Sequence, residues 1–352
     1  MIFSILWKHT RLAIYELEKV VWAQNLNLFN KNVCFFEIER KYEEKLKKLA
    51  WQIKIWIVYS KSEFLKEEFL IKLFKNKKLV GSNDKELLLY LKTRWFVRRF
   101  KVLQDIKKSD IEVKNKWVEI IRFSENLYGI VEWWQPIQIY EKIDFEKPVR
   151  SMKIWMMPAK LTHYLINIST ILEKNKVIYD PFCWLGTTLF VANWLGYDVF
   201  GSDINASPAK QNFKWWQKVS FYNANEKVYI FKQDITKLDI SKKKFLHSVT
   251  NVVSEWFLWP VINRFLNLKE AQKLEDEVWQ IYFKAVDNLL RLPNLENIVF
   301  TFPVYFLKSG MEYKFDKIYN ALQKLGVRIE ILPEIYKRQW QKVWRQIVKI
   351  FK

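Results

Sequence analysis

The second half of the chain alternates short apolar runs with longer segments of mixed polarity. Five runs have the length of strands and follow one another at 177–179, 198–202, 228–231, 248–253 and 298–302. Continuous apolar runs separated by helix-length segments are typical of buried parallel strands joined by crossover helices. Two further runs, 327–332 and 345–351, predict a closing hairpin.

The first half has a different pattern. Short apolar runs at 2–6, 33–38, 53–59, 117–123 and 128–131 alternate with helical stretches at 11–21 and 63–74. This arrangement predicts one or two small α+β domains. Residues 147–150 (KPVR) have the composition of a linker, and 352 residues is about twice the usual domain length. We therefore predict two domains, residues 1–145 and 146–352.

Glycine is scarce in this chain and tryptophan is abundant, with 7 Gly and 18 Trp in 352 residues. Glycine makes up roughly 7% of the residues of an ordinary protein. In this chain, glycine and tryptophan must be added together to reach that share. We hypothesise that most of these tryptophans are glycines in the natural protein. This composition arises when a gene that uses UGA for glycine is translated with UGA read as tryptophan.

Several tryptophans stand where a chain needs positive φ or a close backbone approach, which glycine supplies. They are Trp194 at the end of a predicted helix, Trp133 and Trp134 in a turn-like stretch, and Trp340 and Trp344 around a polar link between two predicted strands. The alternative interpretation is a tryptophan-rich core or a set of stacking platforms.

The chain is strongly basic, with a formal net charge of +21. Residues 1–150 hold 30 basic and 20 acidic side chains, and residues 151–352 hold 29 and 18. A polyanion contacted by both domains is the simplest partner. A lysine-rich proteome would give the same excess, so the charge alone leaves a nucleic-acid partner open.

Other features bear on the compartment. No apolar run approaches the roughly 18 residues of a membrane span, and residues 1–8 become charged too early for a signal peptide. Cys34 and Cys183 have no nearby partner, and His9, His163 and His247 do not have the spacing of a ligand set. We expect a cytoplasmic protein without membrane or metal, and the oligomeric state stays open.

Three acidic residues follow three consecutive predicted strands: Asp180, Asp203 and Asp234. The loop after Asp180 leads into a predicted helix over 187–195, so backbone N–H groups face whatever binds there. Asp203 follows 23 positions later, near the roughly 20-residue spacing at which a carboxylate takes ribose hydroxyls. Asp234 can accept from an adenine amino group. The sequence therefore predicts a nucleotide-like ligand at this edge of the sheet.

The segment 180–187 reads D-P-F-C-W-L-G-T. With glycine at Trp184, it resembles the S-adenosylmethionine-dependent methyltransferases, in particular the amino-group methylases whose loop reads D-P-F-C-G-x-G-T. Residues 150–161 and 336–345 are similar to segments of tRNA guanosine methyltransferases that carry an N-terminal THUMP domain. The resemblance is specific over about 150–352 and fainter over 1–145, where 6–9 and 15–18 are similar to the start of that family.

This resemblance implies an α/β fold, with a Rossmann-like seven-stranded methyltransferase sheet at the C-terminus and a smaller N-terminal α+β region of ferredoxin-like and THUMP-like type. It implies S-adenosylmethionine as the cofactor, tRNA as the partner, and methyl transfer to the exocyclic amine of a guanosine (guanine N2). The expected cofactor-binding residues are Asp180, Phe182, Trp184, Gly186, Thr187, Asp203 and Asp234. Cys183 lies in the same loop but has no basic neighbour that would make it a nucleophile.

The family's catalytic motif, D/N-P-P-Y after the fourth strand, is altered in this chain. Ser254 stands at the Asp or Asn position, Glu255 and Trp256 replace the prolines, and Phe257 replaces the Tyr. An exocyclic amine must have its protons accepted while an aromatic ring holds the base flat. Ser254 or Glu255 can accept and Phe257 can stack, so these three are the predicted catalytic residues for direct in-line transfer to an extruded base. The altered motif leaves open which atom is methylated.

A basic run with interleaved Phe96 and Phe100 lies in the first half. Alternate spacing along a strand would put several of its cations on one face, toward phosphates. The predicted RNA-binding residues are Lys92, Arg94, Arg98, Arg99 and Lys101. A solvated amphipathic strand is the alternative.

Two other functions stay open. A DNA adenine or cytosine amino-methyltransferase shares the D-P-F-C-G-x-G-T loop, but it usually keeps an intact D/N/S-P-P-Y/F/W motif and carries a target-recognition insert that this sequence does not show. A catalytically weak RNA-binding homologue would keep the positive charge and could lose the cofactor site.

Overall fold

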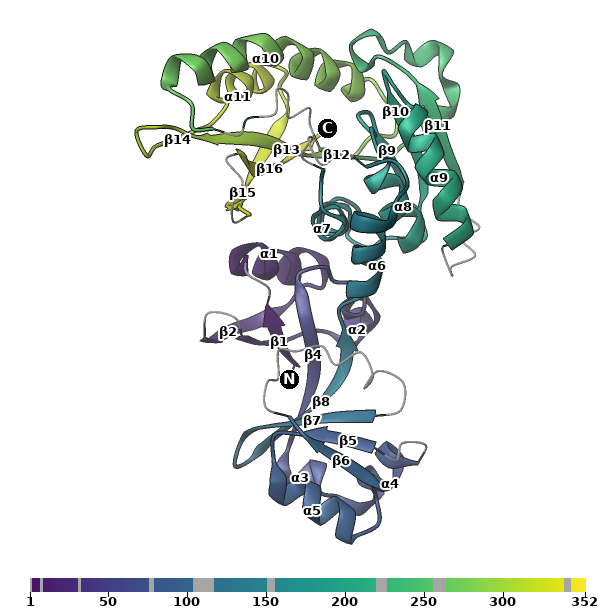
Figure 1. The fold of residues 1–352 in the computed structure, drawn as a ribbon, viewed down its shortest axis with the longest axis vertical. Helices are drawn as coiled ribbons and strands as arrows, with labels where there is room; N and C mark the ends of the chain where they lie inside the picture. Colours follow the sequence, from purple (N-terminus) through teal and green to yellow (C-terminus); the bar gives the residue numbers. More distant parts are fainter. Residues whose placement is uncertain are drawn as a thin grey trace. The chain divides into compact units, whose positions relative to one another are not determined.

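The structure, a computed structural model, describes residues 2–6, 9–30, 33–75, 79–103, 117–150, 156–219, 227–255, 262, 264–338 and 343–352. The chain divides into two compact units, Met1–Pro136 and Ile137–Lys352 (Figure 1). The sequence suggested a boundary between residues 145 and 146. In the structure, helix α6 (Ile137–Glu141) and the short π-helix η3 (Lys142–Glu146) belong to the second unit.

The first unit begins with a β-α-β-β-α-β segment. Its elements are β1 (Ile2–Leu6), α1 (Thr10–Val20), β2 (Gln24–Asn30), β3 (Val33–Glu37), α2 (Glu43–Leu46) and β4 (Gln52–Ser60). The strands lie in the order β2-β3-β1-β4, and β1 pairs antiparallel with both β3 and β4. Helix α1 buries Ala13, Leu17 and Val20, which share one face at helical spacing. This element order is that of a ferredoxin-like fold.

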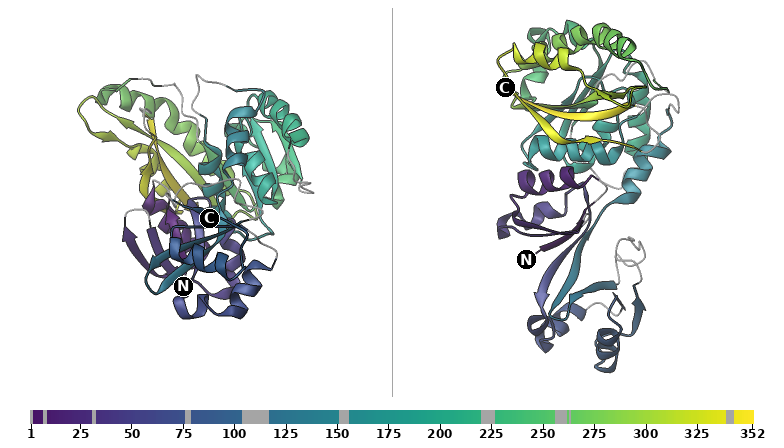
Figure 2. Two further views of the ribbon diagram at one scale, coloured as in Figure 1. Left: turned by 60° about the horizontal axis from the view of Figure 1, so that its bottom comes forward. Right: turned by 90° about the vertical axis from the view of Figure 1, so that its left-hand side faces the viewer.

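The same sheet continues beyond β4. The added elements are α3 (Lys61–Phe64), α4 (Glu67–Phe74), β5 (Leu79–Ser82), α5 (Lys85–Thr93), β6 (Arg99–Val102), β7 (Trp117–Ser124) and β8 (Leu127–Trp134). The strand order continues β4-β8-β7-β5-β6, so β6 is an edge strand. Strands β4 and β8 run side by side through the middle of the sheet (Figure 2). The first unit is therefore α+β, as the sequence predicted.

One helix prediction in this unit is wrong. The stretch 63–74 was expected to be a single helix, but α3 and α4 are separate. Ser60 and Glu63 form a capping box at the start of α3, and the chain leaves the helical conformation at Lys66 before α4 begins.

The expected basic strand is also wrong for most of its length. Lys92 lies on helix α5, because the Asp84 side chain accepts the N–H of Leu87 at the helix start and the helix buries a leucine face. Of the basic residues named from the sequence, Arg99 and Lys101 lie on strand β6.

The second unit is built on a twisted sheet whose strands lie in the order β11-β10-β9-β12-β13-β16-β15. The strands are β9 (Val177–Asp180), β10 (Asp198–Asp203), β11 (Val228–Lys232), β12 (Asn251–Glu255), β13 (Asn297–Phe306), β15 (Arg328–Tyr336) and β16 (Val343–Phe351), with β14 (Glu312–Tyr313) paired to β13. The first five pair in parallel, whereas β16 is antiparallel to both β13 and β15. The predicted Rossmann-like seven-stranded sheet with its closing hairpin is confirmed. The fourth strand begins at Asn251 because residues 244–248 form a 3₁₀ turn.

Helices cover both faces of this sheet (Figure 1). They are α7 (Ala159–Thr170), α8 (Thr187–Leu195) and α9 (Ser207–Val219) on one face, and α10 (Leu268–Leu290) and α11 (Asp316–Gln323) on the other. Phe190 of α8 stacks on Phe213 and Trp216 of α9, and a large apolar core lies beneath α10 and α11. Within the described ranges, no helix is both long and apolar enough to cross a membrane.

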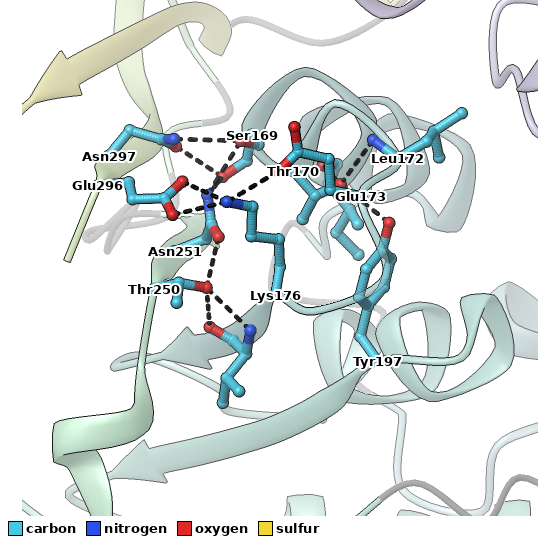
Figure 3. Close-up of polar contacts among 12 residues, drawn as sticks. Ser169, Thr170, Leu172, Glu173, Lys176, Tyr197, Thr250, Asn251, Glu296 and Asn297 are labelled. Atoms are coloured by element: carbon cyan, nitrogen blue, oxygen red, sulfur yellow. Dashed lines mark hydrogen bonds and ion pairs between the residues drawn. The ribbon is translucent and has the colours of Figure 1, made fainter. Parts of the chain in front are cut away.

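The amino ends of the central strands are tied together by a polar network (Figure 3). Asn251 and Asn297 both donate to the Ser169 carbonyl oxygen at the end of α7, at 2.9 and 3.1 Å. Lys176 forms ion pairs with Glu173 and Glu296. These contacts lie at the edge of the sheet opposite the carboxyl ends of β9 and β12, so they fix the scaffold away from the candidate site.

Three tryptophans have a left-handed backbone. Trp22, Trp95 and Trp184 have φ angles of 49°, 63° and 37°, and they are half of the six non-glycine residues with positive φ in the described part of the chain. Positive φ is strained for a bulky residue, whereas glycine adopts it freely. This observation supports the hypothesis that these positions are glycines in the natural protein.

Apart from Trp184, the tryptophans chosen from the sequence for that hypothesis are at other positions. Trp133 and Trp134 lie in strand β8, Trp194 lies inside α8, and Trp344 lies in β16. Trp340 falls outside the described residues. The positive φ at the end of α8 belongs to Gly196, with φ 87°, so these positions give the hypothesis no backbone argument.

Trp95 offers a direct test of backbone strain. Its side chain is 92% exposed, so removing the ring sacrifices little burial. Trp95→Gly should raise the free energy of unfolding by about 1 kcal/mol, because the strain of a left-handed backbone exceeds the conformational entropy that glycine adds. Urea unfolding measures the change. Trp95→Ala is the matched control and should gain less, since alanine keeps Cβ; equal gains for Gly and Ala would contradict the strain argument.

Candidate active site

The three predicted acids lie at the carboxyl ends of adjacent strands. The parallel register places Gly201 beside Asp180 and Lys232 beside Asp203. Asp180, Asp203 and Asp234 therefore follow β9, β10 and β11 along one edge of the sheet. The strand order reverses between β9 and β12, which is the point where open α/β sheets bind their ligands.

Two of these acids hold the loop after β9. The Asp180 carboxylate accepts from the Phe182 N–H at 3.0 Å, and the Asp203 carboxylate accepts from the Trp184 N–H at 3.1 Å. The Cys183 N–H donates to the Ser202 carbonyl oxygen at 2.9 Å. The Phe182 ring packs against the apolar core. The loop is thus fixed to both β9 and β10.

Two glycines are needed for this packing. Gly186, at the start of α8, has φ 85°, and a Cβ there would lie 2.8 Å from Phe190. A Cβ on Gly201 of β10 would lie 2.7 Å from Leu189. A Cβ at either position would force the Phe190 ring or the Leu189 side chain to move, and Gly186 also has the left-handed backbone that glycine favours.

Trp184 does not fit this loop well. Its φ is 37°, and its indole Nε1 is buried without a hydrogen-bond partner among the residues that the structure describes. A buried N–H without an acceptor costs on the order of 1 to 3 kcal/mol. Glycine at this position would relieve both the backbone strain and the unsatisfied donor.

Burial dominates the electrostatics of the loop. It raises the pKa of the Asp180 carboxyl to about 6, although Ser254 and Thr188 side chains and the Phe182 N–H oppose the shift. Burial also raises the pKa of Asp203. The pKa of the Cys183 thiol is raised well above its usual value, so Cys183 stays protonated and is no nucleophile.

Asp234 is partly exposed, with 33% of its side chain accessible. One carboxylate oxygen accepts from the Thr236 N–H at 3.0 Å and the Thr236 hydroxyl at 2.7 Å. This oxygen caps the 3₁₀ turn Ile235–Lys237. The second oxygen is 3.9 Å from the Lys237 ammonium, a distance that leaves it able to accept from a ligand.

Ser254 and Glu255 end strand β12. Ser254 is fully buried, and its hydroxyl donates to the Asp180 carboxylate at 2.6 Å. Glu255 forms an ion pair with the buried guanidinium of Arg345 on β16. Burial raises the pKa of Glu255, and Arg345 opposes that rise. Phe257, the third predicted catalytic residue, lies outside the described residues.

Three residues of this site were missed by the sequence prediction. Arg345 was noted only as part of a C-terminal motif, and its pairing with Glu255 needs the sheet order to be known. Asn212 of α9 bonds both backbone groups of Val149 and the Leu185 carbonyl oxygen. Lys147 is fully buried and donates to Thr187 Oγ1 at 2.9 Å. The stretch 147–150, predicted as a linker, is therefore held against the loop that precedes α8.

The basic residues predicted to contact RNA lie around the end of α5 and the edge strand β6. Lys92, Arg94, Arg98, Arg99 and Lys101 are all exposed. The Lys92 ammonium lies 5.6 Å from the Phe100 ring centroid, and the Arg94 guanidinium lies 5.8 Å from that of Tyr90. Among the residues that the structure places, no group of three His, Cys, Asp or Glu side chains could hold a metal ion.

Comparisons with known proteins show to which family the chain belongs. Residues 15–214 match the N6/N4 methyltransferase family, described as DNA methylase. No curated protein matches the chain. The solved structures that the chain matches include TrmN from Thermus thermophilus (11% identity, all of both chains, TM-score 0.46), a possible methylase from Clostridium difficile 630 (10%, 99% of this chain and 96% of that one, 0.41) and magnesium protoporphyrin IX methyltransferase from Synechocystis PCC 6803 (13%, 61% and 96%, 0.36).

The family match covers more than half of the chain, including the loop from Asp180 to Thr187 and the acid at Asp203. The sheet order, the loop and the acids at the strand ends agree with it. The chain belongs to the N6/N4 methyltransferase family and is an S-adenosylmethionine-dependent methyltransferase.

Proposed function

We propose that this protein methylates the exocyclic amine of a guanosine in tRNA. The observation that carries the proposal is the pairing, in one chain, of a methyltransferase sheet with a separate first unit, which begins with a ferredoxin-like segment and presents exposed cations near α5 and β6. A net charge of +21 supports a polyanionic substrate. The first unit gives the chain a second surface for a folded RNA.

The side chains at the carboxyl edge fit the polarity of S-adenosylmethionine. Asp203 can accept hydrogen bonds from the ribose hydroxyls, and the second carboxylate oxygen of Asp234 can accept one from the adenine amino group. The loop after Asp180 would take the amino-acid part of the cofactor. Phe182, Gly186 and Thr187 shape the loop around the ligand. The Trp184 side chain is the one misfit, since the loop needs a small residue there. When bound, the cofactor supplies an electrophilic methyl group.

The remaining residues prepare the acceptor amine. Glu255 ends β12 beside the switch point, and its carboxylate, already paired with Arg345, is proposed to accept an amine proton. Ser254 acts on the cofactor side, because its hydroxyl orients Asp180. Phe257 follows closely in sequence and is proposed to stack on the base. Transfer is direct, since Cys183 is protonated and buried.

The cations near β6 are proposed to contact the RNA backbone. Arg99 and Lys101 share one face of β6 because side chains two positions apart point the same way along a strand. Lys92, Arg94 and Arg98 precede them on the end of α5 and the following loop. Contacts of this type give affinity without reading the sequence, so the shape of the RNA is what this unit recognises.

DNA is the second candidate substrate. The family that matches residues 15–214 is described as DNA methylase, which favours DNA amino groups. Methyl transfer from labelled S-adenosylmethionine to bulk tRNA and to genomic DNA separates the two, measured with the chain carrying glycine at 184 and 256. Label in tRNA supports the proposal. Label in DNA alone would overturn it, and label in neither would favour a non-catalytic RNA-binding protein.

Asp203 provides a prediction for the cofactor site. In the Trp184→Gly protein, Asp203→Ala should weaken S-adenosylmethionine binding by about 2 to 4 kcal/mol, because up to two hydrogen bonds to a charged acceptor are lost. Calorimetry measures the affinity. Asp203→Asn is the matched control: the N–H groups of residues 184 and 205 bond different oxygens of Asp203, so asparagine keeps an acceptor for one of them, and its loss should be smaller than that of alanine. Unchanged affinity in the alanine variant would show that Asp203 does not hold the ribose.

A further inference from the structure

Lys147 is a buried cation without an acidic partner. Its side chain is fully buried, and its hydrogen bond goes to the neutral Thr187 hydroxyl at 2.9 Å. Within the described residues, no carboxylate lies within 4.0 Å of its ammonium. Burying a charge is costly unless it is paired, so an anionic ligand that reached this ammonium would gain a strong interaction.

The acidic groups near Lys147 are occupied elsewhere. Asp144 and Glu255 both act on it through space. Asp144 accepts from the Ala159 N–H at 2.9 Å, and Glu255 is paired with Arg345. Both carboxylates thus stabilise the charge of Lys147 through space, but neither forms an ion pair with its ammonium.

The segment that carries Lys147 is fixed against the cofactor loop. Asn212 bonds Val149 in both directions at 2.8 and 2.9 Å, and it also bonds the Leu185 carbonyl oxygen at 3.0 Å. Thr187, the partner of Lys147, is the first residue of α8, whose N-terminal N–H groups favour an anion. Lys147 is thus held where the loop meets the helix.

The geometry of the site points to one anion. Asp203 ends β10 and Asp234 follows β11; if they hold the adenosine of the cofactor, its amino-acid part would reach toward β9, the loop and Thr187. The carboxylate is the only anionic group of S-adenosylmethionine. We propose that Lys147 binds the carboxylate of the cofactor's methionine part, and is thereby a specificity residue for the amino-acid end of the ligand.

The inference rests on the cofactor site of the proposed function and not on the RNA substrate, so its test measures binding alone. Two ligands are compared by calorimetry in the Trp184→Gly protein. S-adenosylhomocysteine has the carboxylate, whereas 5′-methylthioadenosine keeps the adenosine and the sulfur but lacks the amino-acid part. Lys147→Met should weaken S-adenosylhomocysteine about tenfold to a hundredfold and leave 5′-methylthioadenosine unchanged within about twofold.

Two variants serve as controls. Lys147→Arg keeps the charge and should retain most of the affinity for S-adenosylhomocysteine. Lys176→Met removes a lysine that has its own carboxylate partners at the opposite edge of the sheet (Figure 3), and it should change neither affinity. Equal losses for both ligands in Lys147→Met would show that the lysine only supports the loop, and no loss for either would also overturn the proposal.

The parent protein gives a readout that needs no substitution at 147. Burial lowers the pKa of Lys147 to about 8, while Asp144 and Glu255 oppose the shift. Its ammonium is charged below that pH, so affinity for S-adenosylhomocysteine should fall as the pH rises above about 8. The same titration in Lys147→Met accounts for the ligand's own ammonium. An identical pH dependence in the two proteins contradicts the proposal. If the Trp184→Gly protein with Lys147 intact binds neither S-adenosylhomocysteine nor 5′-methylthioadenosine, the cofactor site itself is overturned.

Discussion

Replacing Trp184 by glycine is expected to increase the affinity for S-adenosylmethionine by at least tenfold. The indole stands in the loop where the amino-acid part of the cofactor must approach the backbone. The tryptophan also holds a φ of 37° and a buried indole N–H without a partner among the described residues. Calorimetry with S-adenosylmethionine on the two proteins measures the gain.

Trp22→Gly is the matched control for this prediction. Trp22 also has a left-handed backbone, with φ 49°, but it lies in the first unit. The substitution should leave the affinity for S-adenosylmethionine unchanged. We expect methylation of tRNA to appear only when Trp256, beside Phe257 in the catalytic segment, is also glycine. Strong tRNA methylation by the chain with both tryptophans, or UGG at codons 184 and 256 of the gene, would contradict the argument.

The parallel strands could be predicted because their sequences leave little choice. Residues 177–180 and 251–255 are buried on both faces of the sheet, so they appear as continuous apolar runs that end in polar residues. The topology of the sheet alone then gives the positions of the side chains at the strand ends. This is why Asp180 and Asp203 could be placed together before their contacts were known.

The contacts between distant segments could not be predicted. The composition of Lys147-Pro148 is that of a solvated linker, and only the structure shows that Lys147 is buried beside Thr187. The basic run at 92–101 has no periodicity that distinguishes a strand from a helix end, and the deciding contact is the Asp84 cap eight residues upstream of Lys92. Strand β2 (Gln24–Asn30) is rich in asparagine, which seldom occurs in strands, so it gave no signal.

The ion pair between Arg345 and Glu255 gives the second large expected effect. Arg345→Met should lower the free energy of unfolding by about 3 to 5 kcal/mol near neutral pH, because it leaves a buried carboxylate without its partner. Urea unfolding measures the loss. Arg345→Met combined with Glu255→Gln is the matched control, and it should recover most of the stability since no buried charge remains.

The pH dependence of this loss has a definite sign. Burial holds the pKa of Glu255 above its usual value in the folded protein, and removing Arg345 raises that pKa further. Such a carboxyl binds its proton more tightly when folded, so the penalty is absent below the unfolded pKa of about 4.3 and grows as the pH rises toward the folded pKa. The single variant should therefore approach the double variant in stability as the pH falls from 8 to 5. A gap between them that is the same at both pH values would mean that Glu255 is not the group that Arg345 neutralises.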